Sequence, residues 1–221
     1  MKLIYAACIT STLLLSGCTF VSKTFNSAFE PSFNEKVAIS QSMVHQAAIL
    51  LDENKLEQAK SLLDSAYETF PRQSQLHAKY ALYYEKTDNL KLEQLAKSRE
   101  RSMKAKSDAL EKKGFYAMSQ MESHTIAKQL FSLSLIYNQE NTRTLISIAT
   151  LGYTTGDTEL ATASLNILEK IGYQSAEYHM LTYLVAERQA NGDVMREAKL
   201  ALYNGWPSSP QLKLINNKIT G

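Results

Sequence analysis

Apolar and polar positions along residues 35–221 follow a helical rather than a strand-like pattern. Apolar side chains recur three and four residues apart, as on one face of an α-helix, and no segment alternates with a period of two. Short groups of Gly, Asp and Asn mark the expected turns, because Gly tolerates a left-handed backbone and Asp or Asn caps the next helix. These groups are Asp52-Glu53-Asn54, Asp88-Asn89, Gly156-Asp157 and Gly192-Asp193. The pattern predicts an all-α chain of helices joined by tight turns.

Small and apolar residues return through this region with a period of about 34 residues. A less regular unit around Ala96 and Met103, preceded by Tyr80, Ala81 and Tyr84, lies between the first and second regular sets. We expect the alanines of each set where paired helices approach closely, because a larger side chain would force them apart. The period predicts about five antiparallel helix pairs and a short C-terminal capping helix. The regular sets are Ala59, Leu63, Ala66 and Pro71; Ala127, Phe131, Ser134 and Gln139; Ala161, Leu165, Leu168 and Tyr173; and Ala198, Leu202, Gly205 and Pro210.

These sets resemble the second-helix half of the tetratricopeptide-repeat (TPR) signature. The resemblance covers nearly the whole helical region and implies a TPR-type right-handed superhelix, with first helices that line a concave groove for peptides or partner domains. The Trp of the family's first helix is absent, and Glu111 is the largest departure at that position. Generic helical hairpins, including Sel1-like repeats, are the structural alternative. The residues at the Trp position are Met43, His77, Glu111, Leu145 and His179.

The family's groove positions can be transferred to this chain through the 34-residue frame. The residues so selected mix aromatic and polar side chains, which suits recognition of an extended protein segment. They form the expected partner-binding surface of the concave groove. The selected residues are Gln41, Val44, Lys86, Tyr116, Gln120, Arg143, Tyr153, Thr154, Glu187 and Arg188.

The first eighteen residues form a separate unit. Lys2 precedes an apolar stretch from Leu3 to Leu15, which is shorter than the about twenty residues of a membrane-spanning helix and has the length typical of a signal peptide. The stretch ends in Leu15-Ser16-Gly17-Cys18, which resembles the lipobox of bacterial lipoproteins. That resemblance implies removal of residues 1–17 and lipid attachment at the Cys18 sulfur. The alternatives are an ordinary secretory signal with a chance cysteine, or an N-terminal anchor.

The expected organisation is therefore a signal peptide (1–17), a lipidated cysteine with a tether (18–34) and a TPR-like domain (35–221). Thr19 follows the cysteine, where enteric lipoproteins retained in the inner membrane carry Asp. The resemblance thus implies lipid anchoring to the outer membrane, facing the periplasm. We expect some tether aromatics to pack on the first repeat, with contact to the lipid interface as the alternative; these are Phe20, Phe25, Phe29 and Phe33.

Composition and motifs narrow the function classes. The formal charge of +2 gives no whole-chain argument for nucleic acid, and the only cysteines, Cys8 and Cys18, exclude a disulfide framework beyond the N-terminus. The chain carries no G-x-S-x-G, H-E-x-x-H, Walker-type or G-x-G-x-x-G motif. We therefore expect no catalytic residue, cofactor, metal or small-molecule substrate. His77 and His179 stand at equivalent repeat positions, so packing explains them better than a metal site.

Residues 97–113 are rich in Lys and Arg. We expect an exposed helical face here, and the functional alternative is contact with anionic lipid or an acidic partner.

A small lipoprotein built almost wholly of TPRs resembles the assembly lipoproteins of envelope machines. In size and layout it is most similar to the TPR lipoprotein of tight-adherence (Tad) pilus systems, followed by the pilotin-type TPR lipoproteins of type IV pili, which help a secretin assemble. The resemblance implies a scaffold whose partners belong to a pilus or secretion apparatus, a secretin among them. The alternatives are an accessory lipoprotein of outer-membrane protein insertion, like that of the Bam complex, and a regulator of peptidoglycan enzymes.

Overall fold

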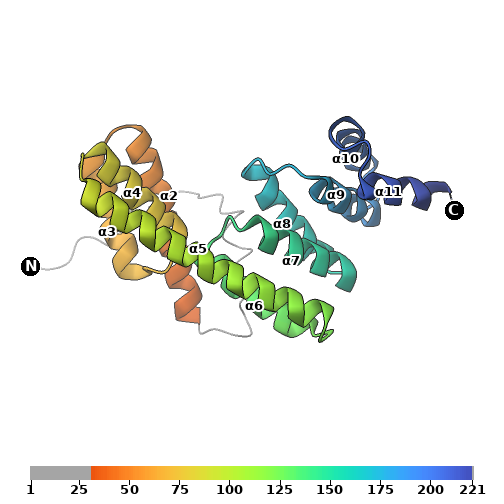
Figure 1. The fold of residues 1–221 in the computed structure, drawn as a ribbon, viewed down its shortest axis with the longest axis horizontal. Coiled ribbons are helices and arrows are strands. Elements are labelled where there is room, and N and C mark those ends of the chain that lie inside the picture. The colour runs from red at the N-terminus through yellow and green to blue at the C-terminus, as the bar shows by residue number, and fades with distance from the viewer. Residues whose placement is uncertain (1–30, 221) are drawn as a thin grey trace, which may run out of the picture.

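All regular elements that the computed structural model describes are helices, which confirms the all-α prediction for that part of the chain (Figure 1). The structure describes the backbone of residues 31–220 and the side chains of 35–217. The expected signal peptide, Cys18 and most of the expected tether lie outside these residues. No described helix is long and apolar enough to cross a membrane. The helices are α2 (Pro31–Asp52), α3 (Leu56–Thr69), α4 (Ser74–Lys86), α5 (Leu90–Ser119), α6 (His124–Tyr137), α7 (Thr142–Thr155), α8 (Thr158–Lys170), α9 (Ala176–Arg188), α10 (Gly192–Gly205) and α11 (Pro210–Thr220).

Successive helices pack as pairs, and the small residues of the repeat lie at their crossings. Ala59, Ala127 and Ala161 are fully buried and Ala198 is nearly so, as the repeat predicted. The expected turns also separate helices: Asn89 and Asp157 cap α5 and α8 by accepting hydrogen bonds from backbone N–H groups. Asn54 and Asp88 adopt positive φ angles of 57° and 54° in the turns before α3 and α5. Local turn chemistry and repeat spacing therefore define most of the fold.

Helix α5 differs from the expectation, because it runs unbroken for 30 residues through the second and third repeat units. Its first half packs on α4 and its second half on α6, so two of the five pairings share one helix. The irregular second unit has no ending of its own, since residues 97–113 contain no Gly or Pro and consist largely of strong helix formers. The i,i+4 ion pairs Lys97–Glu93 and Lys104–Glu100 support the exposed face.

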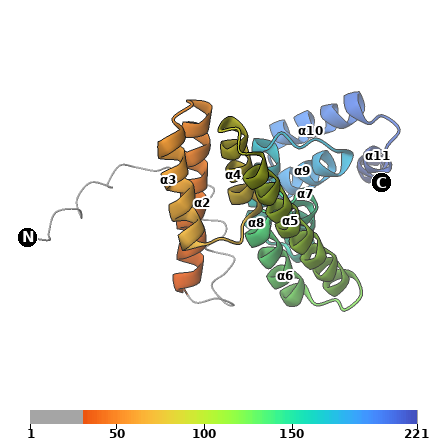
Figure 2. The ribbon, with the colours of Figure 1, turned by 60° about the vertical axis from the view of Figure 1, so that its left-hand side comes forward.

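The continuous helix links two main hydrophobic clusters. One cluster joins α2, α3 and α4 to Ala96 in the first half of α5. The other joins Ala117 in its second half to α6, α7, α8 and α9. In Figure 2, α2 and α3 stand side by side at the left, and α9, α10 and α11 lie at the right. Helix α11 packs on α9 and α10 at the end of the second half.

A buried polar network fixes the contact of α5, α6 and α7. The hydroxyls of Ser107 and Ser134 lie 2.8 Å apart, and Ser134 lies 2.7 Å from the Thr144 hydroxyl. The Asn141 amide donates to Ser107 Oγ over 2.8 Å, while its carbonyl accepts from Thr144 N and caps α7. Nearby, Asn138 at the end of α6 accepts from Ser74 at the start of α4. These small, satisfied groups let the helices approach closely and specify their register.

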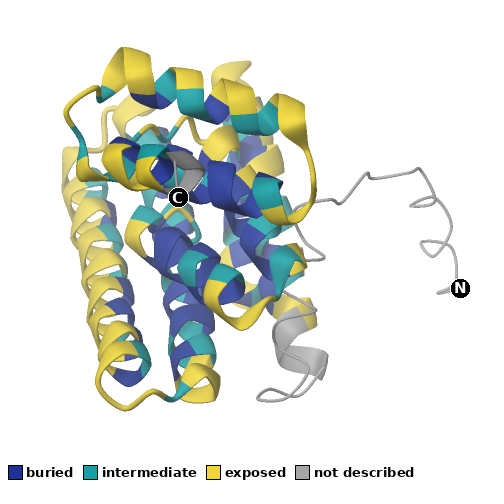
Figure 3. Cartoon of the chain, turned by 90° about the vertical axis from the view of Figure 1, so that its right-hand side faces the viewer, coloured by how far each residue is buried: buried dark blue, intermediate teal, exposed yellow. Residues whose placement is uncertain are grey.

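Buried residues lie mainly on the helix faces that turn toward neighbouring helices, whereas the residues on the outward faces are exposed (Figure 3). Most of α5 after Ala96 faces solvent apart from Ser107, Glu111, Gly114 and Ala117. The expectation of an exposed basic face along residues 97–113 is therefore confirmed.

Candidate partner-binding site

The residues expected to line one concave groove do not lie together. Lys86 ends α4 next to the start of α5, whereas Tyr116 lies near the end of α5. An α-helix rises 1.5 Å per residue, so these two positions are separated by about 40 Å along α5. Val44 is only 5% exposed and belongs to the core of the first half, and Gln41 on the same helix is half-buried. The 34-residue frame misplaces Lys86 and Tyr116 because it assumes a turn within α5, whereas Val44 fails as a groove residue because its side chain is part of the core.

Part of the expected set does meet at the ends of α7 and α9. The Arg188 guanidinium lies 4.0 Å from the centre of the Tyr153 ring and donates a hydrogen bond to the Tyr153 carbonyl. Thr154 instead donates to the carbonyl of Leu151 on its own helix, and Glu187 beside Arg188 is half-buried. The remaining residues, Tyr116, Gln120 and Arg143, are exposed. The Tyr153–Arg188 contact holds α9 against α7.

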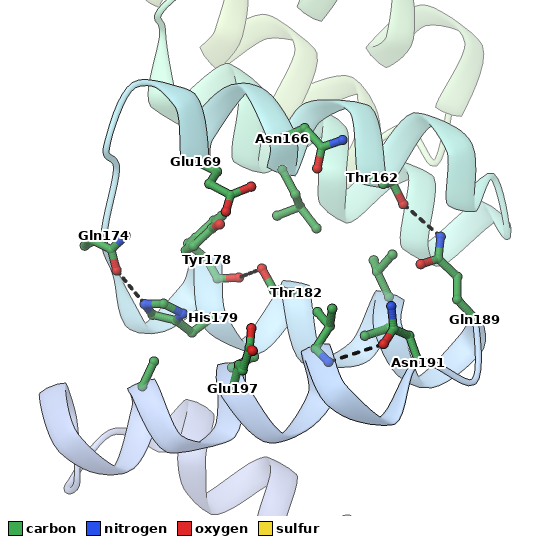
Figure 4. Close-up of a pocket in the computed structure, with 16 residues that line it drawn as sticks. Thr162, Asn166, Glu169, Gln174, Tyr178, His179, Thr182, Gln189, Asn191 and Glu197 are labelled. Atoms are coloured by element: carbon green, nitrogen blue, oxygen red, sulfur yellow. Dashed lines mark hydrogen bonds between the residues drawn. The ribbon is translucent and has the colours of Figure 1, made fainter. Parts of the chain in front are cut away.

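A concave site lies instead between α8, α9 and α10 (Figure 4). This pocket, called the polar pocket after the side chains labelled in Figure 4, has a volume of about 450 Å³. Its lining also includes the apolar residues Leu165, Val185, Ala186, Val194, Ala198 and Ala201. His179 Nε2 lies 2.7 Å from Gln174 Oε1, and Gln189 donates to the Thr162 hydroxyl over 2.9 Å. Polar groups dominate the labelled side chains, and two of them are carboxylates. The labelled lining residues are Thr162, Asn166, Glu169, Gln174, Tyr178, His179, Thr182, Gln189, Asn191 and Glu197.

A second concave site, of about 340 Å³, lies between α3, α4 and α5. In this tyrosine pocket, the Tyr80 hydroxyl donates to Asp64 over 2.7 Å. Burial, and then that hydrogen bond, raise the pKa of Tyr80. Tyr84 stacks on Tyr80 with ring centres 5.9 Å apart, and Tyr67 meets Tyr80 edge-on at 6.3 Å. The lining residues are Asp64, Tyr67, His77, Tyr80, Tyr84, Leu92, Leu95, Ala96 and Arg99.

The two pockets occupy the same place in the repeat. His179 lies 102 residues after His77, which is three periods of 34, and the same shift carries every lining residue of the tyrosine pocket onto a lining residue of the polar pocket. Each pocket is bounded by the second helix of one pair and both helices of the next. Their chemistry differs, since Tyr67 corresponds to Glu169 and Leu95 to Glu197. One backbone framework thus carries an aromatic pocket and an acidic one.

The histidines of the two pockets are buried structural groups. His77 Nε2 lies 2.9 Å from the Pro71 carbonyl oxygen, and the imidazole of His179 packs at 5.0 Å from the Tyr178 ring and 5.3 Å from Trp206. Burial lowers the pKa of both side chains. Within the described residues, no group of three or more His, Cys, Asp or Glu side chains could hold a metal ion. The packing role expected for this pair is what the contacts show.

Two solved structures resemble this chain. No family model matches the chain, and no curated protein matches it. Among solved structures, one described as the functional characterization of Pseudomonas aeruginosa pilF is 17% identical, covers 83% of this chain and 99% of that one, and has a TM-score of 0.39. The crystal structure of PilW, a widely conserved type IV pilus biogenesis factor, is 12% identical, covers 80% of this chain and 98% of that one, and has a TM-score of 0.41. Neither score supports a residue-by-residue correspondence for the pockets.

Proposed function

We propose that this chain is a membrane-anchored scaffold for protein–protein interactions in the assembly of a pilus or secretion system, with no catalytic step of its own. The observation that carries the proposal is the pair of equivalent pockets with different linings on one helical framework. Their volumes fall within the usual range of about 300–1,000 Å³ for sites that take small groups. Each pocket can take side chains of a partner segment, so the scaffold can hold two chemically different segments at a fixed separation.

The tyrosine pocket is the stronger candidate for partner binding. Tyr67 and Leu95 are 38% and 47% exposed at its rim, and Tyr80 and Tyr84 form its inner wall. Aromatic side chains that are already held in place dominate binding energy at protein interfaces, because they bury a large area with little loss of conformational freedom. We expect this pocket to take an apolar or aromatic side chain. The polar pocket, with Glu169 and Glu197, suits a hydrogen-bonding or basic side chain.

The membrane setting is supported by the lipobox-like segment that ends at Cys18. Several acyl chains on one cysteine would hold the protein durably, whereas a single chain binds only reversibly. The outer membrane is the membrane proposed, because Thr19 follows the cysteine. The pilus or secretion setting is supported by the resemblance in size and layout to the Tad and pilotin-type lipoproteins, and a secretin is the partner we would test first.

The pocket role is tested by exchanging exposed rim residues. Tyr67→Ser with Leu95→Ser should reduce surface pili and secretin multimers while leaving the helical content and the level of the protein unchanged. Tyr203→Ser with Leu200→Ser is the matched control, since these side chains are 46% and 60% exposed on α10 outside both pockets. Equal assembly in both variants would refute the pocket role. Normal pili and secretin multimers after deletion of the gene would refute the assembly role altogether.

The anchor is tested separately by Cys18→Ala. We expect the helical domain to fold as before but to leave the membrane fraction, and assembly to fail. Full assembly with a soluble Cys18→Ala protein would show that the anchor is dispensable. Co-purification of the wild-type protein with a barrel-assembly protein, or crosslinks to murein enzymes, would instead favour the two alternative functions.

A further inference from the structure

Exposed apolar side chains gather at the turn between α5 and α6. Phe115, Tyr116, Met121 and Ile126 are 52%, 59%, 54% and 41% exposed and are together called the aromatic tip. Backbone hydrogen bonds from Met121 N to Tyr116 O and from Ser123 N to Ala117 O fold the chain tightly back at this point. The tip therefore consists of the last turn of α5 and the first turn of α6. Large apolar groups held in water in this way are typical of surfaces that contact a partner or a membrane.

Two lysines border the aromatic tip. Lys112 and Lys113 are exposed. Lys112 precedes Phe115 by three residues and Tyr116 by four, so it shares a helix face with both rings, whereas Lys113, three residues before Tyr116, shares a face with Tyr116. Neither ammonium group forms an ion pair with the described residues, whereas Lys128 pairs with Asp157 at 3.5 Å. Glu111, which directly precedes Lys112, is buried, and Glu122 is the exposed acidic residue of the turn. The tip is thus apolar and aromatic at its end and positively charged immediately behind.

The tip lies at the same end of the molecule as the start of the described chain. In Figures 1 and 2, which share a vertical axis, the start of α2 and the α5–α6 turn both lie toward the lower edge, and α10 lies toward the upper edge. Twelve residues separate Cys18 from Pro31. Even fully extended, that segment spans no more than about 45 Å. Since the described chain begins at this end, a membrane that holds Cys18 can reach the aromatic tip without crossing the length of the molecule.

We propose that the aromatic tip rests in the interface of an anionic phospholipid membrane, with Lys112 and Lys113 at the level of the lipid phosphates. Aromatic side chains favour the depth of the headgroups, and lysine stems can lie along apolar surface while the ammonium stays in the polar layer. Anionic lipid attracts the two unpaired charges. The inference rests on the proposed anchoring and adds a second contact, which fixes the orientation of the scaffold and keeps α10 on the side away from the membrane.

The test measures the depth of single tryptophans in the full chain purified with its native N-terminus. In a Trp206→Phe background, Phe115→Trp is compared with Leu214→Trp, which is a similarly exposed site (54%) next to a lysine on α11. Both proteins are reconstituted with vesicles of phosphatidylcholine and phosphatidylglycerol that carry brominated acyl chains. We expect at least about twofold more quenching at position 115 than at position 214. Lys112→Glu with Lys113→Glu should reduce the difference, and Lys213→Glu should not.

The outcomes separate this inference from the proposed anchoring. Equal quenching at positions 115 and 214 in protein that sediments with the vesicles would overturn the tip contact and leave the anchor intact. Protein that does not sediment with vesicles would overturn both. A photocrosslink from position 115 to a protein partner in cells, without lipid quenching, would assign the tip to protein docking and likewise overturn the membrane contact.

Discussion

Replacing Gly152 by Ala tests the close approach of α7 and α8. A Cβ atom built on Gly152 would lie 2.7 Å from Ala161 N, 2.8 Å from Asp157 O and 3.1 Å from Ala161 Cα, whereas ordinary contact begins at 3.4 Å. All three obstructing atoms belong to the backbone, so no change of rotamer can relieve the overlap. The helices must separate beside Ala161, which is fully buried. The change therefore disturbs the packing of the whole pair.

The expected size of the effect follows from two opposing contributions. Overpacking of a close-packed site costs about 1–3 kcal/mol, and replacing a helical Gly by Ala returns about 1 kcal/mol of helix propensity. We expect Gly152→Ala to lower the free energy of unfolding by about 1–2 kcal/mol, because the obstructing backbone puts the cost near the upper part of its range. Gly192→Ala is the matched control, since a Cβ there meets nothing within 4 Å. Gly192 is the first residue of α10, where the propensity gain of a helix interior does not apply in full, and the change should not lower the free energy of unfolding by more than about 0.5 kcal/mol.

The assay is urea denaturation followed by circular dichroism at about 222 nm, with midpoints compared at equal slope. A Gly152→Ala protein as stable as the wild type, or more stable, would refute the reasoning. A large loss of stability in the Gly192 control would refute it as well, because the steric argument would then not distinguish the two sites.

Three further predictions concern buried groups. Gly114→Ala should destabilise the protein by about 1–2 kcal/mol, because the new Cβ would lie 2.6 Å from the Phe131 ring. Phe131→Leu should cost less stability in the Gly114→Ala protein than in the wild type, and additive losses in the urea unfolding of the two single variants and the double variant would contradict this. Burial lowers the pKa values of His77 and His179 below 6.5 in the fold, so the unfolded chain takes up protons first and thermal stability should fall as pH drops below about 6.5; replacing both by Gln should flatten that fall, and an unchanged profile would exclude these groups as its source. Burial disfavours the charged form of Glu111 and so raises its pKa above 4.5. Glu111→Gln should therefore raise the melting temperature at pH 7 and have little effect on it near pH 4, and a lower melting temperature at pH 7 would show that the charge of Glu111 is favourably paired.

The regular part of the fold could be predicted because it depends on local spacing. Ala59, Ala127 and Ala161 recur at multiples of 34 residues and are fully buried at helix crossings. Turns such as Gly156-Asp157 could also be predicted, since a left-handed residue followed by a capping side chain ends one helix and starts the next. These features require only neighbours in sequence.

The continuous α5 could not be predicted from the period, because a repeat does not by itself end a helix. Helices end at Gly, Pro or capping residues, and residues 97–113 contain no Gly or Pro. The expected groove then failed where it depended on an ending within α5, as Lys86 and Tyr116 show. The pockets were also missed, although the equivalence of His77 and His179 was visible in the spacing. The same shift of 102 residues, applied to the neighbouring helices, would have matched Tyr67 to Glu169.

Helix α5 also limits how this chain can change in length. Loops between repeats absorb inserted or deleted residues, because they can rearrange without moving the helices that they join. A residue inserted into the middle of α5 would instead rotate one half of the molecule by about 100° relative to the other and shift it by about 1.5 Å. The buried residues on the two halves of α5 could then no longer face their partner helices at the same time. The 30-residue length of this helix is therefore a fixed dimension of the protein, whereas the lengths of its turns are free to vary.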